Sequence, residues 1–485
     1  MRIQTIEVTN YKAFLGTHKI NMGGKNVFIY GENGSGKSSL YYAMKDFFQS
    51  SIENIDISEL ENIFVHTGMK GKTKIKLTFK PNNLGQNRTK KYLWNKDDND
   101  TRIAADTSIR DANRLKSFLT YKHLLIIHYL KKDERINLFD LLVKGVLKHF
   151  KYSLTGGKEL GELWSDVEQA ISRSTSREYP INKKKTDVKA ATKIFNEAFR
   201  ELFNPGSPEH VLKYAIPILN YFNHNIDLNL HFPQVRPNNE YSSLEGADVQ
   251  VELTYAGMKI DKPHMFLNEA RLSAIAISIY LGMIKRHIQG VPCKVLFLDD
   301  IFIGLDISNR MPLLNILEAE FADYQIFIST YDRPWYEYAK GFLEQKPEWK
   351  TMEFYAQPIG GGIDIPLIFD DLDFIAKAES HLNLCDYKSA AVYTRSAFEK
   401  IIRKHCEKNN KKLIFKSRIK DYSSEDFWSA IKNDIPGPTK DSIETYRALV
   451  LNALSHYNTD RHEIKPELEN AIQAVKDLKS ELGKL

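Results

Sequence analysis

The sequence predicts an α/β fold that is interrupted by a helical insertion and followed by an all-helical domain. Two short apolar runs lie at 26–30 and 294–298, and a glycine ends the first while two aspartates end the second. Short apolar runs that end in turn-forming residues are typical of buried strands. Beyond residue 369, apolar residues recur at helical spacing almost to the end of the chain. We therefore expect the first part of an α/β lobe (1–110), a helical insertion (111–230), the second part of the lobe (231–365) and a helical domain (366–485).

The first half of the chain contains strand and helix patterns in the order that this fold requires. Residues 3–8 and 73–80 alternate apolar and polar side chains, as antiparallel strands do, and a helical pattern starts after Leu40. Helical periodicity dominates from about 110 to 230, with a lysine cluster at 183–185. The sequence contains no sustained heptad repeat, so we expect no long coiled coil.

Strand patterns return in the second half of the lobe. Residues 248–255 alternate again, and a helix is expected from about residue 268. Three glycines at 360–362 indicate a flexible or tight junction, and we place the last domain boundary close to them.

Composition restricts the class of protein. The chain has 485 residues, of which 42% are hydrophobic and 27% charged, as in ordinary globular proteins of several domains. No apolar run reaches the roughly 18–20 residues of a membrane span, and the start lacks a signal-peptide core, so we expect a cytoplasmic protein without membrane contact. The three cysteines lack the spacing of metal ligands or of a disulfide framework. A net charge of +6 is too small to indicate nucleic-acid binding by itself.

A glycine-rich segment joins the strand at 26–30 to the next helix. It matches the phosphate-loop pattern GxxxxGK[ST], in which backbone N–H groups converge on phosphate at a helix N-terminus. A structural glycine turn is the alternative, but a lysine and a serine in register favour ATP and Mg²⁺ as cofactors, with the lysine on the β- and γ-phosphates and the serine on the metal. The expected nucleotide-binding residues are Gly31, Asn33, Gly34, Gly36, Lys37, Ser38 and Ser39.

The second half of the nucleotide site is expected where the strand at 294–298 ends. Asp299 is placed to complete the magnesium shell together with Ser38. Asp300 is placed to orient or deprotonate the attacking water, which requires a carboxylate within hydrogen-bond reach of that water. The alternative is a plain buried strand that ends in an acidic turn.

Four segments together resemble the ATP-binding-cassette ATPases of the SMC and RecF class. They are the N-terminal MRIQTIEVTNYKAF, the phosphate loop GENGSGKSS, the D-loop Gly304-Leu305-Asp306, and LNEARLSA at 267–274, where the signature helix belongs. The resemblance implies that the Asn268 end of this helix caps the γ-phosphate held by a second subunit, and that Asp306 contacts that subunit near ATP. It therefore implies a homodimer or higher oligomer joined through the ATPase heads.

Three positions depart from the pattern of this family. Asn268, Glu269 and Ala270 stand where the family has a serine and two glycines, Asp300 stands where it has glutamate, and Tyr331 stands where it has the switch histidine. A glutamate facing phosphate repels it, a shorter base lies farther from its water, and a tyrosine does not titrate near neutral pH. We therefore expect slow or partner-gated hydrolysis.

Two segments of the C-terminal domain carry polar residues on helices. Arg395 and Glu399 share a face of a helix expected at 387–406, and by themselves predict an exposed ion pair worth about 0.2–0.5 kcal/mol. His456 lies near the end of a second helix, expected at 441–457, where a histidine also suits the helix dipole.

Together, the segments TRSAFEK and NALSHY resemble the nuclease domain of the PrrC/RloC anticodon nucleases, which are related to the HEPN ribonucleases. The resemblance implies a metal-independent endoribonuclease that cuts tRNA and leaves a 2′,3′-cyclic phosphate and a 5′-hydroxyl. His456 or Glu399 would be the base for the ribose 2′-hydroxyl and the other the acid, while Arg395 stabilises the phosphate.

A basic stretch lies between the two motifs. Such a run is usually a solvated face, but beside a ribonuclease site it is expected to follow RNA phosphates, with Phe415 and Tyr422 available for base stacking. Its residues are Lys400, Arg403, Lys404, Lys408, Lys411, Lys412, Lys416, Arg418 and Lys420.

Three hypotheses for the function follow. The first is a cytoplasmic ATPase of bacterial anti-phage defence whose nucleotide-controlled dimer regulates a C-terminal ribonuclease toxin that cuts tRNA. The second is a sensor or clamp, resembling the Septu-type defence ATPases, that restrains a separately encoded nuclease through a non-catalytic C-terminal domain. The third is a RecF-like DNA-repair clamp without a toxin.

Overall fold

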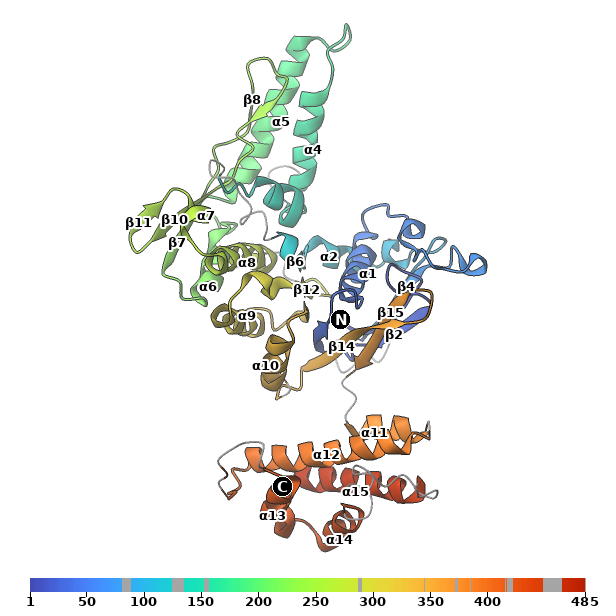
Figure 1. Cartoon of the computed structure of the whole chain (residues 1–485). Coiled ribbons are helices and arrows are strands. Elements are labelled where there is room, and N and C mark those ends of the chain that lie inside the picture. The colour runs from blue at the N-terminus through green and yellow to red at the C-terminus, as the bar shows by residue number, and fades with distance from the viewer. Residues whose placement is uncertain are drawn as a thin grey trace. The chain divides into compact units, whose positions relative to one another are not determined.

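The chain forms two compact units, residues 1–370 and 371–485, in a computed structural model (Figure 1). Each unit is described by itself. The structure describes residues 1–80, 89–123, 135–151, 157–286, 290–343, 345–370, 374–383, 385–414, 416, 422–447 and 465–484.

The first unit is built around a six-stranded sheet in the order β15-β14-β3-β13-β12-β6. All neighbouring pairs are parallel except β14 and β15, so five strands end at the same edge of the sheet. The bounds are β3 Asn26–Gly31, β6 Phe118–Thr120, β12 Val295–Asp299, β13 Gln325–Thr330, β14 Trp349–Pro358 and β15 Asp364–Asp370. The apolar runs expected at 26–30 and 294–298 are confirmed as β3 and β12.

Alternate residues of the central strands face two different hydrophobic cores, because side chains of a strand alternate between its faces. Val27 and Ile29 of β3 belong to one core, and Phe28 and Tyr30 to the other. The first core contains helix α1 (Lys37–Gln49) and one face of an antiparallel sheet in the order β2-β1-β4-β5. The strands of that sheet are β1 Arg2–Thr9, β2 Thr17–Asn21, β4 Lys74–Lys80 and β5 Lys90–Trp94.

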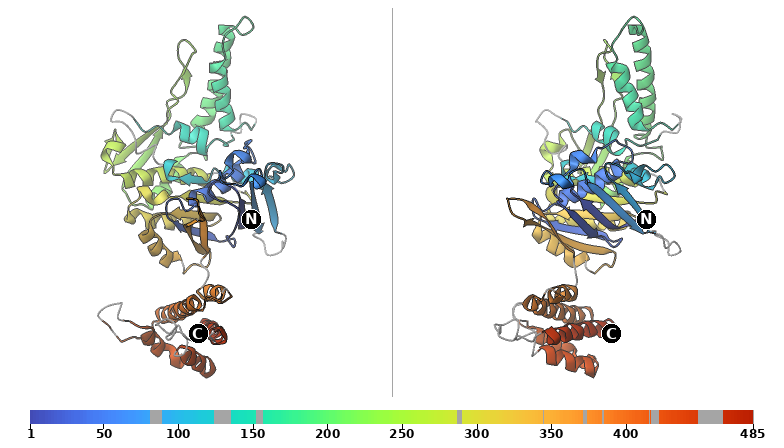
Figure 2. Two further views of the ribbon diagram at one scale, coloured as in Figure 1. Left: turned by 45° about the vertical axis from the view of Figure 1, so that its right-hand side comes forward. Right: turned by 90° about the vertical axis from the view of Figure 1, so that its right-hand side faces the viewer.

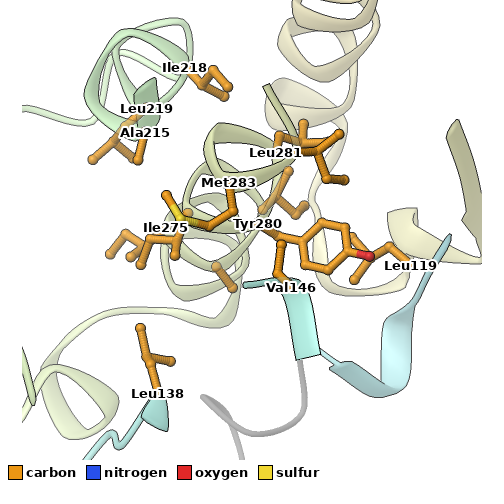
Figure 3. Packing of buried hydrophobic residues seen from close by; sticks show 14 of the residues in the cluster. Leu119, Leu138, Val146, Ala215, Ile218, Leu219, Ile275, Tyr280, Leu281 and Met283 are labelled. Carbon is orange, nitrogen blue, oxygen red and sulfur yellow. The ribbon is translucent and has the colours of Figure 1, made fainter. Parts of the chain in front are cut away.

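Helix α8 (Glu269–Arg286) lies within the second core and is buried on every side from Leu272 to Ile284. The Tyr280 hydroxyl donates a hydrogen bond to the Phe118 carbonyl of β6 at 3.1 Å, and its ring packs near Leu119 and Val146 (Figure 3). A burial pattern of this kind explains why α8 shows no polar face: it has no contact with solvent along its centre. Helices α6 (Leu212–Asn220), α7 (Pro263–Phe266), α9 (Ile307–Glu320) and α10 (Arg333–Leu343) complete this half of the unit.

The insertion contains a pair of antiparallel helices that projects away from the sheets (Figures 1 and 2). The pair consists of α4 (Leu160–Ser172) and α5 (Ile181–Glu201). An aromatic cluster holds the base of the pair together, because Trp164 and Phe195 both contact Phe139, with ring centroids 4.8 and 6.0 Å away. Two small antiparallel sheets lie in the region that follows, with strands β7 Ile226–His231, β8 Arg236–Pro237, β9 Leu244–Glu245, β10 Gln250–Tyr255 and β11 Met258–Ile260.

The expected limits of the insertion need correction. A limit at residue 111 falls inside α2 (Ser108–Arg114), and β6 then pairs with β12, so the chain leaves the central sheet only after Thr120. A limit at residue 230 falls inside β7, which pairs with β10. Strand β6 lies far in sequence from its partner, so a local pattern could not assign it. Strand β7 alternates apolar and polar residues (IDLNLH), which was a usable local signal.

The C-terminal boundary also needs correction. Gly360, Gly361 and Gly362 form the turn between β14 and β15, and all three have positive φ, which favours glycine. Strand β15 therefore belongs to the first unit, and the boundary lies after residue 370 instead of 365.

The second unit is helical, as expected. Its core includes Phe398, whose ring centroid lies 5.7 Å from that of Trp428, and aliphatic residues of the last helix. Its helices are α11 Phe374–Asn383, α12 Tyr387–Lys408, α13 Ser424–Ile431, α14 Gly437–Tyr446 and α15 Lys465–Lys484. None of the helices that the structure describes in either unit is long and apolar enough to cross a membrane.

Candidate functional site

The phosphate loop connects the end of β3 to the first residue of α1. Gly34 and Gly36 have φ values of 83° and 96°, a backbone region that strains residues with a side chain. A Cβ atom on Gly31 would lie 2.9 Å from the Cβ of Phe354 in the neighbouring strand β14. These glycines are therefore required by the backbone, and they leave the N-terminal N–H groups of α1 free to face an anion.

The Lys37 side chain is buried and folds back onto its own loop. Its Nζ donates hydrogen bonds to the carbonyls of Gly31 at 2.6 Å and Glu32 at 3.1 Å. Burial lowers the pKa of Lys37, and the carboxylates of Asp300 and Asp299 oppose that shift. The ammonium group is thus held at the loop, where a phosphate can replace the two carbonyls as its partner.

Ser38 and Asp299 meet across the site although 261 positions separate them in sequence. The Ser38 hydroxyl donates to Oδ2 of Asp299 at 3.1 Å, and the hydroxyl of Ser329 at the end of β13 donates to Oδ1. Burial raises the pKa of Asp299, while these two hydrogen bonds and Lys37 lower it. The structure therefore brings together the serine and the aspartate that the sequence assigns to magnesium.

Asp300 lies directly beside this pair in a left-handed backbone conformation, with φ of 52°. Its N–H donates to the carbonyl of Ser329 at 3.2 Å, which fixes the direction of the residue. Burial and the neighbouring Asp299 raise the pKa of Asp300 to about 6. Its Oδ1 is buried and has no hydrogen-bond partner among the described residues. A carboxylate with these properties is suited to accept a proton near neutral pH.

The donor set fits ATP with magnesium. Ser35 Oγ and Asp300 Oδ1 are both buried without a partner in the described part of the chain, so the hydroxyl can donate a bond to a ligand and the carboxylate oxygen can accept one. Hydroxyl and carboxylate oxygens, as in Ser38 and Asp299, are the ligands that Mg²⁺ prefers. The described residues contain no group of three or more His, Cys, Asp and Glu that could hold a metal by themselves.

The remaining residues of the expected nucleotide site lie around this centre. The Ser39 hydroxyl accepts a bond from the backbone N–H of Ala13 at 3.3 Å and so links α1 to the β1–β2 connection. Asn33 is exposed in the loop, and Tyr331 is 43% exposed just after β13. Asn268 caps the exposed N-terminus of α8, because its Oδ1 accepts from the N–H of Arg271 at 3.0 Å.

Asp306 serves as the N-cap of α9. Its Oδ1 accepts bonds from the Ser308 hydroxyl at 2.8 Å and from the backbone and side-chain nitrogens of Asn309 at 3.1 and 2.7 Å. These hydrogen bonds lower the pKa of Asp306. The aspartate expected to reach a partner subunit is therefore already engaged within its own subunit.

Two residues that contribute to this site were not predicted from the sequence. Ser329 holds Asp299, and Arg310 of α9 joins Asp332 to the Leu305 carbonyl. The hydroxyl residue directly after the apolar residues 326–328 was a usable signal for Ser329, because it stands near the end of a short apolar strand, as Asp299 does. Arg310 lies in an ordinary helical pattern that gives no such signal.

The second unit places Arg395 and Glu399 on α12, where Nε of Arg395 donates to Oε1 of Glu399 at 2.9 Å. Their side chains are 27% and 43% exposed. The end of α14 lies against the same helix, because the guanidinium of Arg447 lies 5.8 Å from the ring centroid of Phe398. His456 lies outside the described residues.

Three residues of the described basic stretch form ion pairs. Arg403 pairs with Glu407 at 3.0 Å, Lys411 with Asp434 at 2.7 Å, and Lys416 with Asp426 at 2.7 Å. The partners of Lys411 and Lys416 lie beyond the stretch in sequence, so the run by itself does not reveal these ion pairs. Phe415, Arg418 and Lys420 lie outside the described residues.

The phosphate loop after β3 and the paired acids at the end of β12 form the arrangement expected of an ATP-binding domain of the ABC-type ATPases. The chain belongs to the family described as RecF/RecN/SMC N terminal domain, whose model matches residues 2–351. This membership implies ATP binding and hydrolysis by the first unit.

Solved structures of SMC heads are also similar to this chain. One is an Smc head domain from Pyrococcus furiosus with an extended coiled coil, bound to the C-terminal domain of ScpA. Its sequence is 14% identical, the match covers 79% of this chain and 99% of that chain, and the TM-score is 0.42. Another is the SMC head domain from Thermotoga maritima, with 12% identity, coverage of 77% and 100%, and a TM-score of 0.35. No curated protein matches the chain.

Proposed function

We propose that this chain is a cytoplasmic ATPase whose two copies close around ATP and thereby control an endoribonuclease in the C-terminal unit. The observation that carries the ATPase half is the hydrogen bond from Ser38 to Asp299, which unites the phosphate loop with the end of β12. This bond forms only where the parallel strands end together, which is the usual ligand site of such sheets.

Exposed apolar residues beside the site support closure between two copies. Phe266 before α8, and Ile303 and Ile307 on either side of the D-loop, are 63%, 44% and 72% exposed. They lie next to the N-termini of α8 and α9 in sequence. Large apolar side chains at such positions are typical of a surface that a partner covers.

Each site residue has a defined task in hydrolysis. Lys37 binds the β- and γ-phosphates, and Ser38 and Asp299 hold Mg²⁺, which neutralises the charge that develops on the phosphate oxygens. Asp300 orients the attacking water and takes its proton. Tyr331 donates its hydroxyl to the γ-phosphate and does not act as a base.

The proposal for the C-terminal unit rests on the partly exposed Arg395–Glu399 pair and on the position of Arg447. Arg447 is the last described residue before the segment that contains His456, and its guanidinium lies 5.8 Å from the ring centroid of Phe398, on the helix that carries Arg395 and Glu399. Arg395 would stabilise the phosphate of the RNA, and Glu399 and His456 would exchange the proton of the ribose 2′-hydroxyl. We propose tRNA as the substrate and defence against phage as the setting.

Purified protein tests the ATPase half through its oligomeric state. Asp300→Asn should bind ATP and accumulate as a dimer, since it retains Lys37 and the magnesium ligands but lacks the base. Lys37→Ala should stay monomeric with ATP, as measured by light scattering after size exclusion. ATP-dependent dimers of Lys37→Ala would contradict the role of the phosphate loop.

Incubation with bulk tRNA in the absence of magnesium tests the ribonuclease half. Wild-type protein should cut tRNA and leave 2′,3′-cyclic phosphate ends, and His456→Ala and Glu399→Gln should not. Cleavage should persist with a non-hydrolysable ATP analogue. If tRNA stays intact under every nucleotide condition, the C-terminal unit is a docking module for a separate nuclease, or the chain is a repair clamp.

A further inference from the structure

The side chain of Arg310 connects two loops that border the hydrolysis site. Its Nε donates to the carbonyl of Leu305 at 2.9 Å, and its Nη1 donates to Oδ2 of Asp332 at 2.6 Å. The side chain is 13% exposed, and its guanidinium lies 5.6 Å from the ring centroid of Trp335. A planar guanidinium with its donors in a fixed fork can hold two acceptors at a fixed separation, which a lysine cannot do.

One end of this connection is the loop after β13. Asp332 follows Tyr331 and is itself held rigidly, because its Oδ1 accepts from the N–H of Trp335 at 3.0 Å and its own N–H donates to Thr330 Oγ1 at 3.1 Å. Hydrogen bonds from Trp335 and Arg310 lower the pKa of Asp332 against the effect of burial, so it stays charged. A shift of Tyr331 on nucleotide binding therefore has to move Asp332 or strain its bonds.

The other end is the segment from Asp300 to Asp306. Leu305 directly precedes Asp306, which caps α9 through its bonds to Asn309. Oδ1 of Asn309 in turn lies 2.8 Å from Nε2 of His224. Hydrogen bonds thus hold this backbone segment at Asp300 and at Asp306. Between these two residues, Arg310 holds it through the carbonyl of Leu305.

We propose that Arg310 is a positioning residue that couples the nucleotide-facing loop at 331–332 to the D-loop. It carries a displacement of Tyr331 to Leu305 and so sets the position of Asp300 and of the partner-facing Asp306. The inference rests on the proposed ATP-dependent dimer, and it adds the residue that links nucleotide contact to closure. Arg310 itself touches no reacting atom.

The test compares Arg310→Gln, Asp332→Asn and the double variant with wild-type protein. Arg310→Gln should bind MgATP within about twofold of wild type, since none of its contacts is to the phosphate loop. Its kcat should fall about 10-fold to 100-fold, because a displacement near 1 Å at a reacting group has an effect of that size. Asp332→Asn should show a similar loss, and the double variant should lose little more than either single variant.

A matched control is Arg236→Gln, which removes an exposed pair with Glu245 at 3.4 Å in the small sheet of the insertion. It should leave kcat, affinity and dimer formation unchanged. Arg310→Lys separates charge from geometry, and it should recover less than the full rate because lysine cannot hold both acceptors.

The outcomes separate the two proposals. If wild-type protein hydrolyses ATP and dimerises, and Arg310→Gln keeps the full kcat, then the coupling role of Arg310 is wrong and the proposed function still stands. A loss of kcat that is matched by an equal loss of MgATP affinity and by a lower melting temperature also overturns the coupling role, since Arg310 would then only hold the fold together. Wild-type protein without ATP-dependent dimers or hydrolysis ends both proposals.

Discussion

Replacement of Asp300 by asparagine should stabilise the nucleotide-free protein while it removes hydrolysis. The pKa of Asp300 is raised from 3.8 to about 6 by burial and by Asp299. A rise of about two pH units means that ionised Asp300 opposes folding by about 3 kcal/mol at neutral pH. A half-buried amide has its own desolvation cost of about 1–2 kcal/mol, so the expected net gain is about 1–2 kcal/mol.

The gain should depend on pH in a defined direction. Well below pH 4 the carboxyl is protonated in both the folded and the unfolded chain, so Asp300→Asn should there be less stable than wild type by the desolvation cost of the amide, about 1–2 kcal/mol. Between pH 4 and 6 the unfolded chain loses its proton while the folded chain keeps it, and wild type loses stability as pH rises. Above pH 6 the difference should stay constant.

Thermal unfolding of the first unit, followed without nucleotide at pH 4 and pH 7.5, measures this effect. Asp299→Asn is the matched control, because Ser38 and Ser329 each donate to one of its two carboxylate oxygens. An amide nitrogen cannot accept either bond, so this variant should gain less stability than Asp300→Asn or lose some. An Asp300→Asn protein that melts at or below the wild-type temperature at pH 7.5 would refute the electrostatic reasoning.

Further predictions concern the same base and two glycines. The kcat/KM for ATP at saturating magnesium should fall as pH drops below about 6, because Asp300 must be deprotonated to act as base; a rate that is flat down to pH 5 would exclude it. Gly282→Ala should destabilise the first unit by about 1–3 kcal/mol, since a Cβ there would lie 2.7 Å from the Ala215 backbone, and denaturant unfolding measures this. Gly341→Ala, in a helix where a Cβ would meet nothing within 4 Å among the described residues, should instead stabilise it by about 0.5–1 kcal/mol; equal effects of the two changes would contradict the packing of α6 on α8.

Local patterns predicted the parts of the site that lie within single segments. The phosphate loop was recognisable because the glycines, Lys37 and Ser38 must stand at fixed offsets for one loop to bind phosphate. Asp299 and Asp300 were recognisable because an apolar run ended in two acids. The pairing of Ser38 with Asp299 was expected from their chemistry, and the geometry of that pair comes from the structure.

Boundaries between parts were less predictable, since they depend on which strands pair with one another. The short strand β6 has only three residues, and its assignment rests on pairing with β12. Three consecutive glycines occur both in linkers and in hairpin turns, so the residue types at 360–362 do not distinguish the two. Only the pairing of β14 with β15 shows that they form a turn.

The sequence by itself determined which residue types stand at the candidate sites: Lys37, Ser38 and Asp299 at the expected ATP site, and Arg395 and Glu399 on a helix of the C-terminal unit. Those features depend on residue type and local spacing, which are properties of short segments. The tertiary structure decided the environment and the contacts of these side chains. It raised the pKa of Asp300 by burying it next to Asp299, and it placed Arg310 between two loops. Burial and long-range contacts arise only when distant segments pack together, so no local pattern encodes them.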